Sequence, residues 1–211
     1  MKILLDADDM IFAQKPAGVL SEQSAEGDDA VTQLSRLTGG AIYPVHRLAR
    51  AVGGVMVFAK TQDASRRLSA PGAVEKDYIA VVHGETQPCG EWRDFLFKDS
   101  GKNKSYVVKK LRRGVREAAL SYETASVKDG MSLVRIKLET GRSHQIRVQF
   151  ASRCHPLVGD GKYGASDGCP VALFSRSVAA HDGSGKTIAA SATPDDVFPW
   201  NVFDLSVFDD I

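Results

Sequence analysis

The segment YPVHRLARAVGGVMVFAKT, residues 43–61, has the residue types expected of the approach to an active site. Two basic residues, His46 and Arg47, precede the glycine pair Gly53–Gly54, and an apolar run typical of a strand follows. The centre of this loop is occupied by Ala49, whose methyl group can do no chemistry. The segment therefore predicts a functional loop whose centre carries no reactive side chain.

A second candidate is LETGRSHQIRVQFASRCHPLVGDGKYG, residues 138–164. A helix that starts with Ser143 as its N-cap would place His144 and Arg147 on one face, with Arg142 at the helix start. Arg147 lies among apolar neighbours, so we expect it to be buried, and a buried arginine needs an anion. That anion belongs either to a functional site or to a local carboxylate that pairs with a core arginine.

Two further residues, His155 and Tyr78, have side chains that could take part in binding or catalysis, but neither lies in a motif specific for such a role. His155 could bind a metal, but no second histidine or acid lies at ligand spacing, which favours a structural histidine. Tyr78 lies in the alternating run VEKDYIAVVHG, where a tyrosine usually packs. Beside a substrate base, its ring could instead stack and its hydroxyl could exchange a proton.

A basic run, KDSGKNKSYVVKKLRRGVRE, extends from Lys98 to Glu117 and holds eight Lys or Arg residues against two acids. One interpretation is a solvated basic hairpin. The other is a surface for a polyanion, because clustered Lys and Arg release counterions when they neutralise phosphates. Charge alone does not decide between the two.

The length of 211 residues and the hydrophobic content of 43% suit one domain of about 200 residues. No run approaches the ~20 apolar residues that span a bilayer, and MKILLDADD lacks the pattern of a signal peptide. Cys89, Cys154 and Cys169 form no CxxC pair. We therefore expect free thiols, no zinc site and a cytoplasmic location.

The elements that must position these residues follow from the hydrophobic pattern. Three helices are expected, within residues 28–40, 61–70 and 143–153. Seven runs are typical of strands: MIFAQ, GVMVFAK, DYIAVVHG, SYVVKKL, ALSYETASV, SLVRIKLET and VALFSRSVAAH. Because hairpins dominate over βαβ units, we expect an α+β fold with a mostly antiparallel, mixed β-sheet core and flanking helices.

Four segments resemble, in order and spacing, the motifs of RNA pseudouridine synthases of the RluA type: QKPAGVLS, VHRLARAVGGVMVFAKT, EKDYIAVVHG and ETGRSHQIRVQFASRCHPLVGDGKYG. The resemblance implies the pseudouridine synthase fold as a single catalytic domain, residues 1–211, without the S4 RNA-binding domain of some relatives. It implies an isomerase that converts uridine in structured RNA to pseudouridine, with no cofactor and no metal. We expect a monomer whose partner is a stem-loop of ribosomal or transfer RNA, with no membrane association.

The resemblance also implies roles for individual residues. Ala49 stands where the family has an aspartate that acts as a nucleophile on the ribose or as the base that takes a sugar proton. Tyr78 matches the tyrosine that stacks on the target uracil, and Arg147 matches the arginine that pairs with the aspartate. Arg47 matches the residue that replaces the flipped nucleotide. The expected RNA-binding set is completed by His46, Arg142, His144, Gln145, Lys104, Lys109, Arg112 and Arg113.

Ala49 predicts that the chain is inactive as written, because no other acid is expected to replace the carboxylate. The alanine is either a natural loss in a paralogue that kept RNA binding or a deliberate Asp→Ala substitution. Retention of the aspartate's expected partners favours the second. The alternative function is a non-catalytic RNA-binding or RNA-folding factor. Without the aspartate, a buried Arg147 is expected to recruit a water, a solvent anion or another acid.

Overall fold

The computed structural model describes residues 1–25 and 27–209, and the chain folds as two compact units. The first unit contains Met1–Asp77 and Phe174–Pro194. The second contains Tyr78–Leu173 and the C-terminal segment from Asp195 onward. The polypeptide passes from one unit to the other three times, so neither unit is one continuous segment. The single domain expected over residues 1–211 stays a prediction.

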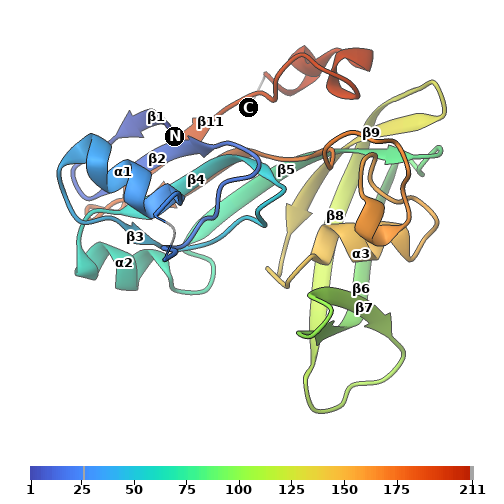
Figure 1. Cartoon of the computed structure of the whole chain (residues 1–211), viewed down its shortest axis with the longest axis horizontal. Helices are drawn as coiled ribbons and strands as arrows, with labels where there is room; N and C mark the ends of the chain where they lie inside the picture. Colours follow the sequence, from blue (N-terminus) through green and yellow to red (C-terminus); the bar gives the residue numbers. More distant parts are fainter. Residues whose placement is uncertain (26, 210–211) are drawn as a thin grey trace. The chain divides into compact units, whose positions relative to one another are not determined.

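The first unit is built on a sheet whose strands lie in the order β1-β2-β4-β10. Figure 1 labels β1, β2 and β4. The strands of this unit are β1 (Lys2–Asp6), β2 (Met10–Lys15), β3 (Tyr43–Pro44), β4 (Gly53–Ala59), β10 (Leu173–His181) and β11 (Thr187–Ser191). β3 pairs with β4, and β11 pairs with β10. All these pairs are antiparallel except β4 with β10, which run parallel.

Two capped helices complete the first unit. Helix α1 (Ala30–Thr38) begins at Asp29, whose carboxylate accepts the Thr32 N–H, and it ends at Gly39 in the left-handed conformation. Helix α2 (Gln62–Leu68) begins after Thr61, whose side chain accepts the Ala64 N–H. The apolar face of α2 joins a buried cluster with side chains of β2, β4 and β10. The two helices expected from the sequence in this unit are thus confirmed.

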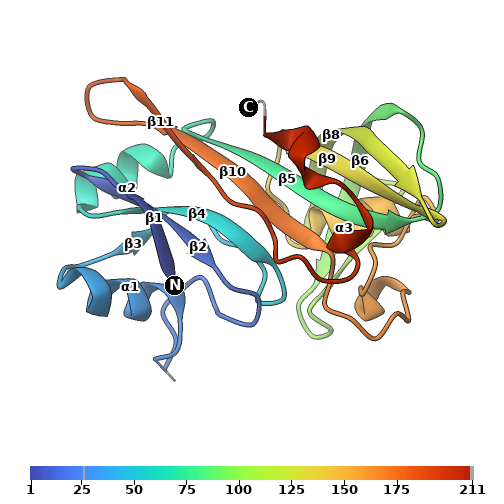
Figure 2. The same cartoon turned by 90° about the horizontal axis from the view of Figure 1, so that it is seen from above.

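The second unit contains strands in the order β5-β9-β8-β6-β7. They are β5 (Val74–His83), β6 (Cys89–Asp99), β7 (Lys104–Val108), β8 (Val115–Lys128) and β9 (Met131–Leu138). Figure 2 labels β5, β6, β8 and β9. The pairs β6–β7, β6–β8 and β8–β9 are antiparallel. The helical elements are α3 (Gln145–Ala151) and the 3₁₀ turns η1 (Gly161–Tyr163), η2 (Trp200–Val202) and η3 (Leu205–Phe208).

An aromatic cluster packs α3 against the sheet of the second unit. The ring centroid of Trp92 lies 4.6 Å from those of both Tyr122 and Phe150. Gly90 pairs with Tyr122 across the strands, and a Cβ at Gly90 would come within 2.6 Å of the tyrosine ring. The glycine therefore lets the ring lie flat on the neighbouring strand.

The α+β class, with a mostly antiparallel and mixed sheet, is confirmed. All seven expected strand runs are strands, whereas β1, β3, β6 and β11 were not anticipated. One helix boundary was wrong: the N-cap of α3 is His144 and not Ser143. His144 adopts the left-handed conformation there, with φ 54° and no side-chain cap hydrogen bond. Across the described residues, none of the helices is long and apolar enough to cross a membrane.

The parallel contact between β4 and β10 generates a stability prediction. Gly54 has φ +124°, and a Cβ there would lie 2.4 Å from the backbone N and O of Ser175. We expect Gly54→Ala to lower the free energy of unfolding by about 2–4 kcal/mol, because both the backbone and the strand spacing must change. Urea unfolding measures this. Gly53→Ala is the control, since its nearest contacts would be 3.4 Å away. Equal unfolding midpoints for the two variants would contradict this account.

Candidate functional site

The candidate residues divide between the two units. His46, Arg47 and Ala49 lie in the first unit, in the loop between β3 and β4, which we call the Ala49 loop (residues 45–52). Tyr78, Arg147 and the rest of the expected RNA-binding set lie in the second unit. Within it, three of them, Lys104, His144 and Arg147, gather around one ring, that of Tyr163.

The Ala49 loop is held by the segment that follows β2. The Ser21 hydroxyl donates to the Leu48 carbonyl at 2.9 Å and accepts from the Leu48 N–H at 3.0 Å. The Gly18 N–H donates to the Arg50 carbonyl at 2.7 Å, and Arg50 Nε donates to the Gly18 carbonyl at 2.8 Å. Position 49 is therefore fixed from both sides without any contribution from its own side chain.

Lys15 shapes the segment that holds the Ala49 loop. Its side chain is fully buried, and Nζ donates to the carbonyls of Pro16 at 2.9 Å and Val19 at 2.8 Å. Burial lowers the pKa of Lys15 to about 8. Within the described part of the chain, no carboxylate forms an ion pair with this ammonium group. Lys15 thus holds residues 16–19, in the segment after β2, around its ammonium group, and it does so through backbone carbonyls alone.

His46 is a structural member of the Ala49 loop. Its Nε2 accepts the Val57 N–H at 3.1 Å, which continues the pairing of β4 beyond the short strand β3. Burial and, to a lesser extent, the Lys76 ammonium lower the pKa of His46 to about 3. The ring is therefore neutral and carries its proton on Nδ1, so it supplies no positive charge for a phosphate.

Arg47, by contrast, is available at the surface. Its side chain is 59% exposed, and its ion pair with Glu22, at 3.7 Å, is equally exposed. Such a pair contributes little to stability and is easily exchanged. Arg47 is thus an exposed cation two residues before Ala49, held only by a surface ion pair.

Tyr78 begins the second unit and is 6% exposed. Burial raises the pKa of its phenol above the usual range, so the hydroxyl remains protonated at neutral pH. Tyr78 can therefore donate a hydrogen bond or a proton, but it carries no negative charge.

Arg147 forms a bidentate ion pair with Asp160. Nε and Nη2 donate to the two carboxylate oxygens, each at 2.6 Å, and the side chains are only 8% and 0% exposed. The expectation that a buried Arg147 recruits another acid is thus confirmed, and the open alternative of a local carboxylate is the one observed. Charge-assisted forks of this kind fix the orientation of the guanidinium plane as well as its position.

Gln145, in the expected RNA-binding set, is turned inward. It is 2% exposed, and its Oε1 accepts from the Thr140 hydroxyl at 2.8 Å and from the Arg142 N–H at 3.0 Å. Its Nε2 donates to the Ala119 carbonyl at 3.0 Å. The amide therefore shapes the turn before α3. Arg142 itself is exposed, with Nε bonded to the Glu117 carbonyl.

The basic run forms the β6–β7 hairpin and the loop that leads into β8, which confirms the hairpin interpretation. Lys109, Arg112 and Arg113 are exposed, whereas Lys104 is partly buried. The Arg112 guanidinium lies 5.6 Å from the centroid of the Phe97 ring. The exposed cations also meet the requirement of a polyanion surface, so the two interpretations are compatible.

Three residues that position the site were not anticipated as such. Asp160 and Tyr163 lie in the quoted GDGKYG segment, but nothing in their spacing reveals that one binds Arg147 and the other contacts His144. A buried Lys15 next to a proline gives no sequence signal either. The usable clue was the arginine in an apolar helix, which required a carboxylate somewhere.

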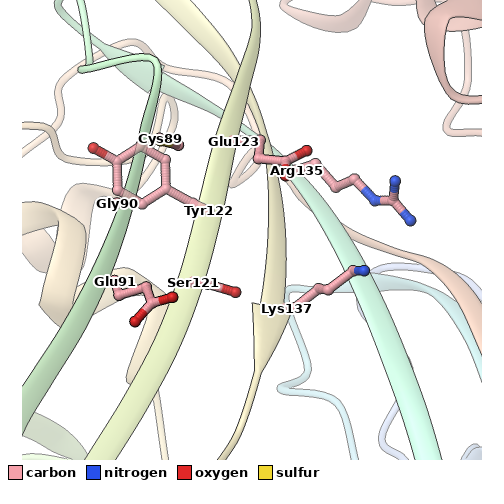
Figure 3. A pocket seen from close by; sticks show the side chains of 8 residues that line it. All are labelled: Cys89, Gly90, Glu91, Ser121, Tyr122, Glu123, Arg135 and Lys137. Atoms are coloured by element: carbon pink, nitrogen blue, oxygen red, sulfur yellow. The ribbon is translucent and has the colours of Figure 1, made fainter.

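A separate surface groove of about 490 Å³ lies on the second unit over β6, β8 and β9 (Figure 3). Its lining contains two acids, Glu91 and Glu123, and two bases, Arg135 and Lys137. None of these belongs to the predicted site. Among the residues that the structure describes, no group of three or more His, Cys, Asp or Glu side chains is arranged to hold a metal.

The fold has close counterparts among solved structures. Human RNA pseudouridylate synthase domain containing 1 superposes with a TM-score of 0.76 over 94% of this chain and 84% of its own, at 20% sequence identity. This likeness defines the class of fold. A family model described as RNA pseudouridylate synthase matches residues 9–152, which is more than half of the sequence. The chain belongs to the RNA pseudouridylate synthase family, and the resemblance found in the motifs is confirmed.

Curated relatives agree with this assignment. The chain is 32% identical over 181 residues to tRNA pseudouridine synthase C of Haemophilus ducreyi, covering 78% of this chain and 74% of that protein. It is 31% identical over 181 residues to ribosomal large subunit pseudouridine synthase D of Zymomonas mobilis, covering 79% of this chain. The match spans only 56% of the latter protein.

The buried ion pair predicts a large effect of Asp160→Asn. Removal of one partner leaves the Arg147 charge uncompensated, which we expect to cost roughly 3–5 kcal/mol of unfolding free energy. Chemical denaturation followed by tryptophan fluorescence measures the change. Asp63→Asn is the matched control because its pair with Arg66 is exposed. If both substitutions have the same small effect, the pair does not stabilise the second unit.

Lys15 predicts a dependence of stability on pH. Because its folded pKa lies near 8 and its unfolded pKa near 10.5, the unfolded chain binds the proton more tightly between these values. Stability should therefore rise with pH, by about 2 kcal/mol between pH 8 and pH 10. The free energy of unfolding is measured at each pH for the chain as written and for Lys15→Met, and the difference between the two isolates the contribution of Lys15. A flat difference would show that the ammonium group is not desolvated.

Proposed function

We propose that this chain carries the scaffold of an enzyme that isomerises uridine in RNA to pseudouridine, and that Ala49 leaves it inactive as written. The carrying observation is the family match over residues 9–152, which includes the Ala49 loop and helix α3. The names of the two relatives point to transfer and ribosomal RNA as the substrate classes of those proteins. We extend that class to this chain, with a structured stem-loop as the target.

The chemistry requires cleavage of the N-glycosidic bond and reattachment of the base through carbon 5. A carboxylate at position 49 would act on the ribose as a nucleophile or as a base toward a sugar proton. The methyl group of Ala49 can do neither. The target nucleotide must also leave the base stack, at a cost of a few kcal/mol. Arg47 is suited to fill the vacated space because its side chain is long, cationic and exposed.

Tyr78 of the second unit supports this proposal through its protonation state. It is a buried, protonated phenol, which suits stacking on uracil and proton transfer. Two nitrogen atoms of Arg147 already donate to the carboxylate of Asp160. We therefore assign Arg147 to site architecture first and to a carboxylate at position 49 second.

The proposal needs no cofactor and no metal. We place the protein in the cytoplasm, where its RNA substrates are found, and its three cysteines are free thiols, as a reducing compartment requires. We propose that it acts as a monomer.

A second candidate is a non-catalytic RNA-binding or RNA-folding factor on the same scaffold. The observation in its favour is that Asp160 satisfies Arg147, so this part of the protein carries no unpaired buried charge when residue 49 is alanine. This candidate requires an alanine codon in the native gene. It also requires salt-sensitive RNA binding by the chain as written.

The proposed function predicts that Ala49→Asp creates activity. RNA transcripts that contain 5-tritiated uridine should release tritium with Ala49→Asp and not with the chain as written. Ala51→Asp is the control, because it adds the same charge to an exposed neighbour in the loop. If Ala49→Asp is silent on transfer and ribosomal RNA transcripts while remaining folded, the enzyme proposal fails. If the Ala49 chain itself releases tritium, the assignment of the essential carboxylate is wrong.

A further inference from the structure

The hydroxyl of Tyr163 has three hydrogen-bond partners. It accepts the N–H of Ser105 at 2.9 Å, donates to the carbonyl of Ser105 at 3.2 Å, and lies 3.1 Å from Nδ1 of His144. A phenol has one proton, and here the Ser105 carbonyl takes it. With the phenol proton assigned to the Ser105 carbonyl, we assign Nδ1 of His144 as the donor in the third contact, which places the imidazole proton on Nδ1.

This assignment leaves Nε2 of His144 as a lone-pair acceptor. Burial, followed by the charges of Arg147, Lys162 and Lys98, lowers the pKa of His144 to about 4, although Asp160 opposes the shift. The ring is thus neutral at physiological pH. Within residues 1–25 and 27–209, Nε2 has no hydrogen-bond partner, and the side chain is only partly buried.

The backbone holds this ring in an uncommon position. His144 has φ 54°, in the left-handed region, which is uncommon for residues other than glycine although asparagine, aspartate and histidine adopt it more often than the rest. The preceding carbonyl, of Ser143, accepts the Ser105 hydroxyl at 2.6 Å, which ties this bend to β7. Strained residues of this kind persist where the surrounding structure determines them, and they cluster at binding sites.

Three lysines, Lys98, Lys104 and Lys162, lie near His144 and Tyr163. The Lys104 ammonium lies 4.9 Å from the centroid of the Tyr163 ring. Lys162 donates to the Asn103 carbonyl at 2.9 Å and keeps two further donors, and Lys98 is exposed. Ammonium groups bind phosphates, and the ligand that the proposed function brings to these lysines has a sugar–phosphate backbone. The hydrogen-bond donor that a ribose backbone offers, and a deoxyribose backbone lacks, is the 2′-hydroxyl.

We propose that Nε2 of His144 accepts a hydrogen bond from a ribose 2′-hydroxyl of the bound RNA, while Lys104, Lys162 and Lys98 bind the neighbouring phosphates. The proposal rests on the proposed function, since it takes RNA as the ligand. According to the proposal, His144 distinguishes a ribose from a sugar that lacks a hydrogen-bond donor at the 2′ position. It does not depend on catalysis, so the chain with Ala49 is the protein to test.

The conformation of His144 supplies two matched variants. His144→Gly tolerates the left-handed backbone conformation but removes the side-chain hydrogen-bond acceptor. His144→Asn also tolerates this backbone and carries an acceptor oxygen on a shorter side chain. The probes are one uridine-containing RNA stem-loop and the same stem-loop with 2′-fluoro riboses, which keep the A-form but lack the donor. Binding is measured by fluorescence anisotropy, and folding is checked by thermal unfolding.

The chain as written should bind the RNA probe about fivefold more tightly than the 2′-fluoro probe, as one net hydrogen bond provides. This ratio should fall to about one in His144→Gly and be partly restored in His144→Asn. The slope of affinity against salt should be the same in both variants, whereas Lys162→Gln should reduce it.

Three outcomes overturn the proposal. If the chain as written binds the RNA probe and the 2′-fluoro probe equally tightly, the 2′-hydroxyl contact does not exist. Binding of the RNA probe would still support the proposed function in that case. If His144→Gly weakens both probes equally, Nε2 accepts from a base N–H instead. If the chain binds neither probe at low salt, the RNA-binding basis of both proposals fails, and the tritium assay with Ala49→Asp then tests the isomerase proposal independently.

Discussion

The ion pair of Arg147 with Asp160 is the buried interaction around which His144 and Tyr163 of the second unit are arranged. It joins helix α3 to the turn that leads into η1, and both partners are withdrawn from water. With Asp160 fixed, Tyr163 follows three residues later and reaches the backbone of Ser105. The orientation of His144 depends in turn on Tyr163. A single charge-assisted contact thus determines where the neighbouring polar groups lie.

The Ala49 loop shows a different kind of constraint. The Ser21 hydroxyl and the backbone of the segment after β2 hold the loop directly. The buried ammonium of Lys15 holds that segment in turn. None of these contacts involves the side chain of residue 49, so the loop does not need a carboxylate there to fold. A position for which we propose a catalytic carboxylate can in this way be neutral for structure. That separation explains why the rest of the motif can be retained around an alanine.

Much of the fold was predictable because its signals are local. Helices α1 and α2 lie within the expected ranges 28–40 and 61–70, and the alternating apolar runs form strands. β6 was missed because its charged and aromatic residues obscure the alternation. Ser143 was a better N-cap by residue type than His144, but contacts to β7 bend the chain one residue later. The need of Arg147 for an anion was foreseeable from burial, whereas its pairing with Asp160 is a tertiary fact.

The contact between Tyr163 and Ser105 has a consequence for the behaviour of the protein in concentrated solution. β7 is the last strand in the order of the second unit, so one side of its backbone has no partner strand. The phenol hydroxyl accepts from the N–H and donates to the C=O of Ser105, as an adjacent strand would. Exposed strand edges invite pairing with other chains, which leads to aggregation or strand exchange. Tyr163 therefore protects the hairpin from intermolecular β-sheet extension at the point where the backbone would otherwise be open.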